Sequence, residues 1–496
     1  MCPLMKMCSC HFIFFIICLC ALSKTPFANI INVPLPVFKN SLHSTMELVQ
    51  NVVSAIPRIR MYADAQDDHD DHDRNLNIAI SHCADVLGST YEALNWSLSA
   101  IHRDPKGYTQ YYRTSTDVIS HARARLDANL GSQKTCMEVF DGTKYSMAAQ
   151  SFKQVTTSTQ ELLSMLQVPP GRGRRAANAG LKFLQTPNVT VCKDGNGNFR
   201  TIMEAVAVAP NHSQDHFVIF VKKGFYEENV KIDSQKWNLV MIGEGMDVTT
   251  ISGSRSSRDG WSTFDSPTFA VSAEGFIAMD IGFENAAGPE GLQAVALLSA
   301  SDGAVFYRCK ISGHQDSLCV HVGRQFYRDC QISGSVDFIF GYGTAVFQNC
   351  ALIVKKNVIG KISVVTAHGR YALNDSSGFS FQSCKISADP DFTGEAYLGR
   401  PWGEYSRTVF IQSYISNVIM PEGWLEFRGS FGTDTLYYGE YMNTGPGAEL
   451  AGRVKWTGYH VIANPSEADW FTAAKFIDGN SWLPSTGIPF IQGLKP

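Results

Sequence analysis

A short pattern centred on a cysteine recurs through the middle of the chain. Tyr-Arg-Cys309-Lys-Ile-Ser-Gly returns as Arg-Asp-Cys330-Gln-Ile-Ser-Gly, and weaker copies lie around Cys350, Cys384 and Ser413. The first steps are about 20 residues long, a period typical of solenoids, in which each coil stacks on the one before it. The repeat therefore predicts an elongated stack of coils.

Two carboxylates occupy the same phase of successive repeats. Asp316 follows Gln315, and Asp337 follows Val336. Residues one coil apart in a solenoid of strands lie roughly one strand spacing apart, about 4.8 Å. We therefore expect Asp316 and Asp337 to face each other on adjacent coils.

The chain reads as short strands from residue 188 onward. Runs such as Phe217-Val-Ile-Phe-Val and Leu239-Val-Met-Ile are rich in β-formers and are bounded by Gly, Asn and Asp. A helix is expected at Thr201–Pro210, where it would cap the open end of the solenoid, and a short packing helix at Ala468–Phe476. Residues 188–496 are therefore predicted to form an all-β domain, a parallel β-helix.

The N-terminal part contains segments of a different kind. Residues 1–23 combine Lys6 with a short apolar run and a small-residue exit, which is typical of a secretory signal peptide; a signal anchor is the alternative. Residues 24–75 are interpreted as a linker that ends in an acidic run, Asp64–Asp73. The acidic run is either a solvated linker or a metal-binding tract, and the composition favours the linker.

Residues 76–168 change to helical periodicity. Apolar residues recur at helical spacing from Ile78 to Leu166, and Pro and Gly are sparse, so we expect a small all-α bundle. Cys83 and Cys136 lie on separate predicted helices and are candidates for a disulfide. Residues 169–187 follow as a linker broken by Pro and Gly, with Arg172, Arg174 and Arg175 in an exposed stretch.

Composition excludes some classes of function. The net charge of -4 provides no basic face for nucleic acid. No Cys-x-x-Cys pair indicates a zinc site, and no Gly-x-Ser-x-Gly indicates a serine esterase elbow. Disulfides are possible in a secreted chain, but the sequence alone leaves their connectivity open. Glycosylation sequons begin at Asn95, Asn188, Asn211 and Asn374.

Several motifs, taken in order, resemble the signatures of plant pectin methylesterases. They are Gln293-Ala-Val-Ala-Leu, Gln315-Asp316-Ser-Leu, Arg324-Gln-Phe-Tyr-Arg-Asp, Asp337-Phe-Ile-Phe-Gly and Leu398-Gly-Arg400-Pro-Trp402. The resemblance covers residues 188–496 and implies a right-handed parallel β-helix. The preceding helices resemble the pectin-methylesterase-inhibitor pro-region of that family, although the early cysteine pair of that region is missing. The arginines of the linker resemble the processing site between the two parts.

The resemblance implies hydrolysis of the C6 methyl esters of homogalacturonan in the plant cell wall. Asp337 is the candidate nucleophile, kept ionised by a bidentate pair with Arg400. Asp316 is the candidate proton donor, its pKa raised by repulsion from Asp337. The amide of Gln315 is the candidate transition-state stabiliser, with Gln293 beside it as a substrate contact.

Further groove residues are expected from the same resemblance. Thr263 matches the substrate-binding threonine of the family. Aromatic side chains are expected to pack against sugar rings; they are Trp402, Phe264, Phe340, Tyr397 and Trp424. No cofactor or metal is expected. The expected partners are pectin, a processing protease and, as a further candidate, a proteinaceous inhibitor. The enzyme is expected to be a monomer.

Some positions depart from the family pattern. His314, Ser317, Cys319, Tyr342-Gly343 and His368 replace the usual residues beside the motifs. Cys319 is either buried or paired with Cys192. The resemblance favours a Cys350–Cys384 disulfide and makes Cys309–Cys330 possible.

These departures keep a second hypothesis open, a wall-binding or inhibitor-like protein with a weakened site. A β-helical polygalacturonase or lyase would need another arrangement of carboxylates, or a calcium cluster with a catalytic base. The sequence shows neither arrangement.

Overall fold

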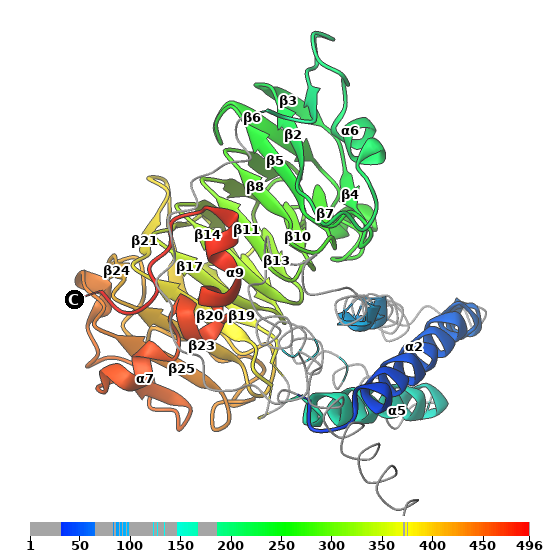
Figure 1. The fold of residues 1–496 in the computed structure, drawn as a ribbon. Coiled ribbons are helices and arrows are strands. Elements are labelled where there is room, and N and C mark those ends of the chain that lie inside the picture. The colour runs from blue at the N-terminus through cyan, green and yellow to red at the C-terminus, as the bar shows by residue number, and fades with distance from the viewer. Residues whose placement is uncertain are drawn as a thin grey trace, which may run out of the picture.

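The computed structural model describes residues 31–64, 146–166, 186–370, 373 and 375–495, together with individual positions between 83 and 133. In its larger part the strands form three sheets of 11, 8 and 7 strands, here called sheets 1, 2 and 3. The strands named below pair in parallel with their neighbours, and the sheets run side by side along a common axis (Figure 1).

The strand bounds are as follows. Sheet 1 contains β1 (Val189–Val191), β2 (Phe217–Val221), β5 (Leu239–Gly243), β8 (Ile277–Met279), β11 (Ala304–Tyr307), β14 (Arg324–Arg328), β17 (Thr344–Gln348), β20 (Gly378–Gln382), β23 (Arg407–Ile411), β25 (Tyr437–Tyr441) and β26 (Tyr459–Val461). Sheet 2 contains β3 (Gly224–Glu227), β6 (Thr249–Gly253), β9 (Gly282–Asn285), β12 (Lys310–Ser312), β15 (Gln331–Gly334), β18 (Ala351–Val354), β21 (Lys385–Ala388) and β24 (Tyr414–Ile415). Sheet 3 contains β4 (Val230–Ile232), β7 (Phe269–Val271), β10 (Leu297–Ser299), β13 (Leu318–Val320), β16 (Ile339–Gly341), β19 (Ile362–His368) and β22 (Glu395–Gly399).

One coil of the chain visits each sheet in turn. Strand β11 belongs to sheet 1, β12 to sheet 2 and β13 to sheet 3, and the next coil begins with β14 in sheet 1. The register pairs Phe306 with Tyr327, and Leu318 with Ile339. This is the shift that the cysteine repeat predicts. The predicted fold class, a right-handed parallel β-helix, is confirmed.

A column of stacked aromatic rings fills the interior beneath sheet 1. Phe306, Tyr327, Phe347, Phe381 and Phe410 come from successive coils, each three residues before the repeated cysteine or serine. Ring centroids of neighbours lie 4.5–4.9 Å apart, with interplanar angles of 9–14°. The column is fully buried, so it ties five coils together by the apolar area that it removes from water.

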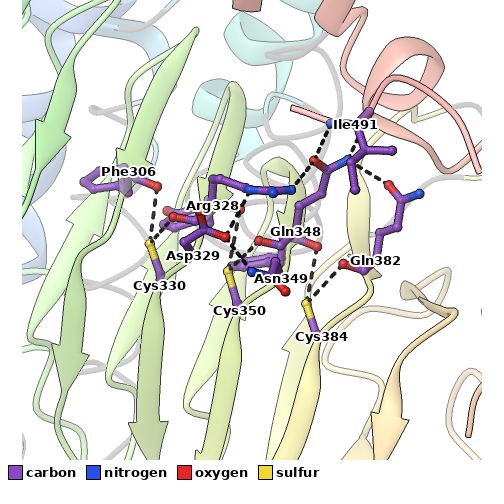
Figure 2. Close-up of polar contacts among 12 residues, drawn as sticks. Phe306, Arg328, Asp329, Cys330, Gln348, Asn349, Cys350, Gln382, Cys384 and Ile491 are labelled. Carbon is purple, nitrogen blue, oxygen red and sulfur yellow. Dashed lines mark hydrogen bonds and ion pairs between the residues drawn. The ribbon is translucent and has the colours of Figure 1, made fainter. Parts of the chain in front are cut away.

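The repeated cysteines form a second column, and their sulfurs are free thiols. Each thiol donates to a backbone oxygen of the preceding coil, as from Cys330 to Phe306 at 3.2 Å (Figure 2). Cys384 likewise donates to the Phe347 oxygen at 3.4 Å. The residue before each of these cysteines adopts a left-handed conformation, for example Asp329 with φ 54°. The favoured Cys350–Cys384 disulfide and the possible Cys309–Cys330 disulfide are therefore wrong, because all four sulfurs are free thiols that donate to backbone oxygens.

Helices cover the N-terminal end of the solenoid and the outer face of sheet 1. Helix α6 (Ile202–Val208) caps the N-terminal end as predicted, with Thr201 and Glu204 forming a capping box. The expected helix near residue 468 is broken into α7 (Pro465–Asp469) and α8 (Ala473–Phe476), and α9 (Gly479–Thr486) follows. Short 3-10 turns lie at η3 (Ser257–Asp259) and η4 (Pro446–Ala448).

The C-terminal tail lies along sheet 1, where a column of glutamines holds it. The amides of Gln348, Gln382 and Gln412 donate to the backbone oxygens of Ile491, Gly493 and Lys495 at 2.7, 2.7 and 2.8 Å, and the first two glutamines appear in Figure 2. The glutamines come from successive coils, so alternate residues of the tail bind to successive coils.

The N-terminal helices correct the interpretation of residues 24–75 as a linker. Helix α2 spans Leu35–Asp64 and packs against α5 (Ser146–Ser164). The buried face of α2 is a row of apolar residues at helical spacing, which the sequence interpretation missed: Phe38, Leu42, Val49, Val52 and Ile56. The acidic run lies almost entirely outside the described residues.

The other described positions of this part agree with a helical bundle. Val86, Leu94 and Leu126 are helical and buried in the same core as α2 and α5. Cys83 is disulfide-bonded, and the residue predicted to pair with it, Cys136, lies outside the described residues. No helix in the described part of the chain is long and apolar enough to span a membrane.

We predict that Phe347→Ala destabilises the solenoid by about 3–5 kcal/mol, because it opens a cavity at the centre of the aromatic column. Phe225→Ala is the matched control: this ring is 48% exposed, and its loss should change the free energy of unfolding by less than about 0.5 kcal/mol. Denaturant unfolding of both variants measures the difference. Equal effects of the two substitutions would contradict the role of the column.

Candidate active site

Asp316 and Asp337 lie in equivalent turns between sheet 2 and sheet 3. Asp316 separates β12 from β13, and Asp337 separates β15 from β16. Because Leu318 pairs with Ile339, the two aspartates are in register on adjacent coils, and the Asp316 amide donates to the Val336 oxygen at 3.0 Å. Both aspartates have positive φ, 65° and 49°, a left-handed turn conformation that also recurs between sheets 1 and 2.

Arg400 reaches Asp337 from the end of β22. Its Nε donates to Oδ1 of Asp337 at 2.8 Å, and its Nη2 donates to Oδ2 at 2.5 Å. The guanidinium also lies over the ring of Phe427, 5.0 Å from its centroid. The two ion-paired side chains remain 24% and 15% exposed, so the expected bidentate pair is present and solvent reaches it.

The amides of Gln293 and Gln315 lie beside the carboxylates. The two glutamines form a parallel bridge between adjacent coils, and both are partly exposed. Within residues 186–370 and 375–495, neither side-chain amide has a hydrogen-bond partner. The site therefore contains uncharged N–H donors that are available to a ligand.

Burial and charge make the two carboxyl groups unequal. Burial, and then the charge of Asp337, raise the pKa of Asp316 well above its usual value, while Arg400 opposes the rise. The pKa of Asp337 is also raised by burial, but less strongly, because the charge and hydrogen bonds of Arg400 oppose the rise. Repulsion from Asp337 was the expected cause of the raised pKa of Asp316, but burial is the larger cause. Asp316 is the carboxyl group that holds its proton to higher pH.

The outer face of sheet 3 forms an apolar floor next to the carboxylates. Leu298, Cys319 and Phe340 stand in register on successive coils and are all buried. Phe264 and Trp402 are partly exposed and pack against this floor. Cys319 is a free thiol, so the alternative of a bond to Cys192 is wrong, and burial raises the pKa of its thiol.

Three of the expected groove aromatics are not available to a ligand. Trp424 is 1% exposed and stacks on Tyr438 inside the solenoid, with ring centroids 4.1 Å apart. Phe340 and Tyr397 are also buried. Trp424 faces inward and Phe340 lies beneath Trp402, so Phe264 and Trp402 are left at the surface.

A further ring at the surface belongs to Tyr342, which the sequence marks as a departure from the family pattern but not as a ring that packs against sugars. Tyr342 is partly exposed, and its ring lies 5.1 Å from that of Trp402 at an angle of 30°. Gly369 makes room for this ring, because a Cβ there would lie 2.6 Å from it. The ring of His368 forms a hydrogen bond through Nε2 with the backbone oxygen of Gly343, next to Tyr342, at 3.3 Å. His368 and Tyr342-Gly343, which both depart from the family pattern, are therefore in contact. The sequence signal for this residue was its position: Tyr342 directly follows β16 of sheet 3, the sheet whose outer face forms the apolar floor.

Thr263 lies in the loop that carries Phe264. Thr263 is partly exposed, and its backbone oxygen accepts a hydrogen bond from Ser266 at 3.0 Å. The ring of Phe264 lies 5.2 Å from that of His321, at the edge of the apolar floor. Among the described residues, no group of three or more His, Cys, Asp or Glu is placed to hold a metal ion.

We predict that Asp316→Asn raises the melting temperature at pH 7. A carboxyl group whose pKa is raised by folding stabilises the protein while it is protonated, and this contribution is lost as the pH rises through the raised pKa. Asparagine mimics the protonated form, so its advantage should shrink as the pH falls toward the ordinary pKa of aspartate, about 3.9. Exposed Asp391→Asn is the control, expected to leave the melting temperature unchanged. A variant less stable than the wild type at pH 7 would refute the assignment.

Comparison with known proteins identifies the family. A family model described as Pectinesterase matches residues 188–480, and one described as Plant invertase/pectin methylesterase inhibitor matches residues 5–166. The chain is 45% identical over 521 residues to probable pectinesterase/pectinesterase inhibitor 44 of Arabidopsis thaliana, covering 96% of this chain and 97% of that one. It is 47% identical over 475 residues to pectinesterase/pectinesterase inhibitor PPE8B of Prunus persica, covering 91% and 88%.

Solved structures agree with these matches. Pectin methylesterase from carrot superposes with a TM-score of 0.62 at 47% identity, covering 62% of this chain and 99% of that one. The Aspergillus niger enzyme gives 0.52 at 31% identity, covering 63% and 97%. The chain therefore belongs to the pectinesterase family and carries a pectin methylesterase inhibitor domain ahead of its pectinesterase domain.

Proposed function

We propose that this chain is a secreted pectin methylesterase that hydrolyses the C6 methyl esters of homogalacturonan to demethylated pectin and methanol. The observation that carries the proposal is the unequal pair of carboxyl groups. Asp337 is ion-paired with Arg400, whereas Asp316 forms no salt bridge with any described residue and has the more strongly raised pKa. A pair of this kind supplies one ionised nucleophile and one protonated acid at the same pH.

In the first half of the proposed reaction, Asp337 attacks the ester. A carboxylate oxygen of Asp337 bonds to the carbonyl carbon, and the resulting oxyanion accepts a hydrogen bond from the Gln315 amide, with Gln293 contacting the substrate beside it. Collapse of this intermediate breaks the bond to the methoxy oxygen. Asp316 gives its proton to that oxygen, so methanol leaves and an acyl-enzyme remains.

In the second half, water cleaves the acyl-enzyme. Asp316, now ionised, takes a proton from the water as its oxygen attacks the acyl carbon. Asp337 departs as a carboxylate, and Arg400 stabilises the charge that returns to it. The cycle ends with Asp316 protonated and Asp337 ionised, as it began.

The groove beside this pair is proposed to hold the polysaccharide. The rings of Trp402, Tyr342 and Phe264 offer apolar faces on which pyranose rings can pack, and Thr263 lies in the same loop as Phe264. Methylated sugars are uncharged, so they approach the two acidic residues without the repulsion that a free galacturonate would meet.

The remaining assignments rest on sequence. Residues 1–23 are proposed to direct secretion to the cell wall, residues 169–187 to be cut by a processing protease, and the mature enzyme to act as a monomer without cofactor, metal or nucleic acid. The inhibitor domain makes a proteinaceous inhibitor a plausible further partner.

We predict that Asp337→Asn reduces methanol release from methylated homogalacturonan to less than about a tenth of the wild-type rate, a barrier increase of more than ~1.4 kcal/mol. Asparagine is nearly isosteric, so the fold should survive while the nucleophile is lost. The rate of methanol formation, measured with a secreted sample of matched melting temperature, tests this expectation.

Asp329→Asn is the matched control for that experiment. Asp329 also has a positive φ in a turn of the solenoid and is ion-paired, with Arg328 at 3.1 Å, but it lies between sheets 1 and 2. Its substitution should leave methanol release unchanged. Retained activity in Asp337→Asn would remove the nucleophile assignment, and binding of pectin without any methanol release by the wild type would favour the wall-binding alternative.

We predict that processing follows Arg175, so that the secreted enzyme begins at Ala176. Replacing Arg172, Arg174 and Arg175 together with alanine should leave the precursor uncut, because the basic recognition sequence is removed. N-terminal sequencing and intact mass of the secreted protein measure the outcome, with Lys182→Ala as the control for loss of a basic residue nearby. An unchanged product from the triple variant would place the cut elsewhere.

A further inference from the structure

A lysine from two coils away binds the turn that carries Gln315 and Asp316. Lys355 follows β18, and its backbone amide donates to the Gly334 oxygen of the adjacent coil at 2.7 Å. Its ammonium group extends one coil further. Nζ donates to Oγ of Ser312 at 3.0 Å and to the backbone oxygen of Gly313 at 3.0 Å. Ser312 is the last residue of β12, and Gly313 begins the turn that carries Gln315 and Asp316.

The other attachments of the turn to the next coil are backbone hydrogen bonds. The Gly313 amide donates to the Ser333 oxygen at 3.3 Å, the Ser335 amide donates to the His314 oxygen at 2.9 Å, and the Asp316 amide donates to the Val336 oxygen at 3.0 Å. Gly334 lies directly against the turn, since a Cβ there would come within 2.6 Å of the His314 oxygen and of the Ser317 hydroxyl oxygen. No side chain can therefore extend from that position to support the turn. Lys355 supplies the support from one coil further along.

The positive charge of Lys355 is partly buried and faces uncharged oxygens. Among the described residues Lys355 forms no salt bridge, and its hydrogen bonds go to uncharged oxygens of the turn. Burial lowers the pKa of this partly buried lysine, and the charges of Asp389 and Glu284 oppose that effect while Lys310 adds to it. Partial burial of an ammonium group without a paired carboxylate costs free energy, and hydrogen bonds to protein oxygens offset that cost.

His314, inside the same turn, is subject to the same environment. Burial, followed by the charge of Lys355, lowers the pKa of His314 to about 4, so its ring is neutral at the pH of most assays. Its Nδ1 is buried without a hydrogen-bond partner among the described residues. The ring therefore adds no polar contact through Nδ1 that would hold the turn if Lys355 were removed.

We propose that Lys355 is a positioning residue, which fixes the turn so that the Gln315 amide and the Asp316 carboxyl group are held at the reacting ester. The inference rests on the proposed esterase function, because it assigns Lys355 a part in the same site. Its contacts are with Ser312 and Gly313, and it acts on the reaction only through the turn.

The kinetic test compares Lys355→Met with Lys355→Arg and Lys356→Met. A displacement of about 1 Å in catalytic groups reduces the rate up to about 100-fold. We expect Lys355→Met to lower kcat by about 10- to 100-fold with KM changed less than about 3-fold, since the lost interactions act in the transition state. Lys355→Arg keeps the donors and should recover most of kcat. Lys356 is exposed, so Lys356→Met removes the same charge and should match the wild type.

The pH profile separates positioning from loss of charge. A loosened turn lets water reach Asp316, so its raised pKa should fall and the alkaline limb of kcat/KM should move to lower pH, with Asp337 and Arg400 unchanged beside it. Removal of a positive charge alone would move that limb to higher pH. Unchanged kcat, or an alkaline limb moved upward, would overturn the proposal.

Hydrogen exchange provides a readout that does not depend on activity. Peptides covering residues 312–318 should exchange faster in Lys355→Met than in the wild type, Lys355→Arg or Lys356→Met, while peptides from the aromatic column stay unchanged. Equal exchange in all variants would overturn the proposal. Absence of methanol release by the wild type would instead refute the proposed function, and the exchange result would still decide whether Lys355 holds the turn.

Discussion

The hydrogen-bonded register between coils determines where every functional group lies. Sheet 3 pairs Leu318 with Ile339, so the turns before these residues stack and bring Asp316 beside Asp337. The same register stacks five aromatic rings inside the solenoid and a column of cysteine thiols at the turn between sheets 1 and 2. A slip of one residue would reverse which side chains face inward and would separate the carboxylates at the same time. Stability and site geometry therefore depend on one constraint.

Within that frame, the two carboxyl groups become different through their surroundings. Both are raised in pKa by burial, but Asp337 has a guanidinium at hydrogen-bonding distance, whereas Asp316 is affected by Arg400 only at longer range. Two stacked aspartates without Arg400 would compete for one proton with no fixed assignment. Arg400 directly follows β22, so which of the two aspartates keeps its proton depends on a contact between residues 63 positions apart in the sequence.

Repeats and local motifs were readable from the sequence because they depend on periodic spacing. The solenoid, the stacked aspartates, the capping helix α6 and the Arg400 pair all follow from spacing or from family motifs. Helix α2 was not predicted, although Phe38, Leu42 and Val49 have helical spacing and are buried.

Other features depend on three-dimensional packing that spacing does not specify. Trp424 faces inward, where its ring stacks on that of Tyr438. The cysteines lie on successive coils, yet their thiols donate to backbone oxygens and do not form disulfides. Lys355 forms hydrogen bonds with a turn two coils away, and the residues around Lys355 in the sequence do not indicate this contact.

A carbon-13 NMR titration of the aspartate carboxyl groups, assigned with Asp316→Asn and Asp337→Asn, tests most directly whether the two groups differ in protonation. We expect Asp337 to lose its proton at lower pH than Asp316. We also expect Arg400→Gln to narrow the difference between the two pKa values by raising the pKa of Asp337. Deprotonation of Asp316 before Asp337, or two carboxyl groups that both titrate near the ordinary value for aspartate, would contradict these expectations.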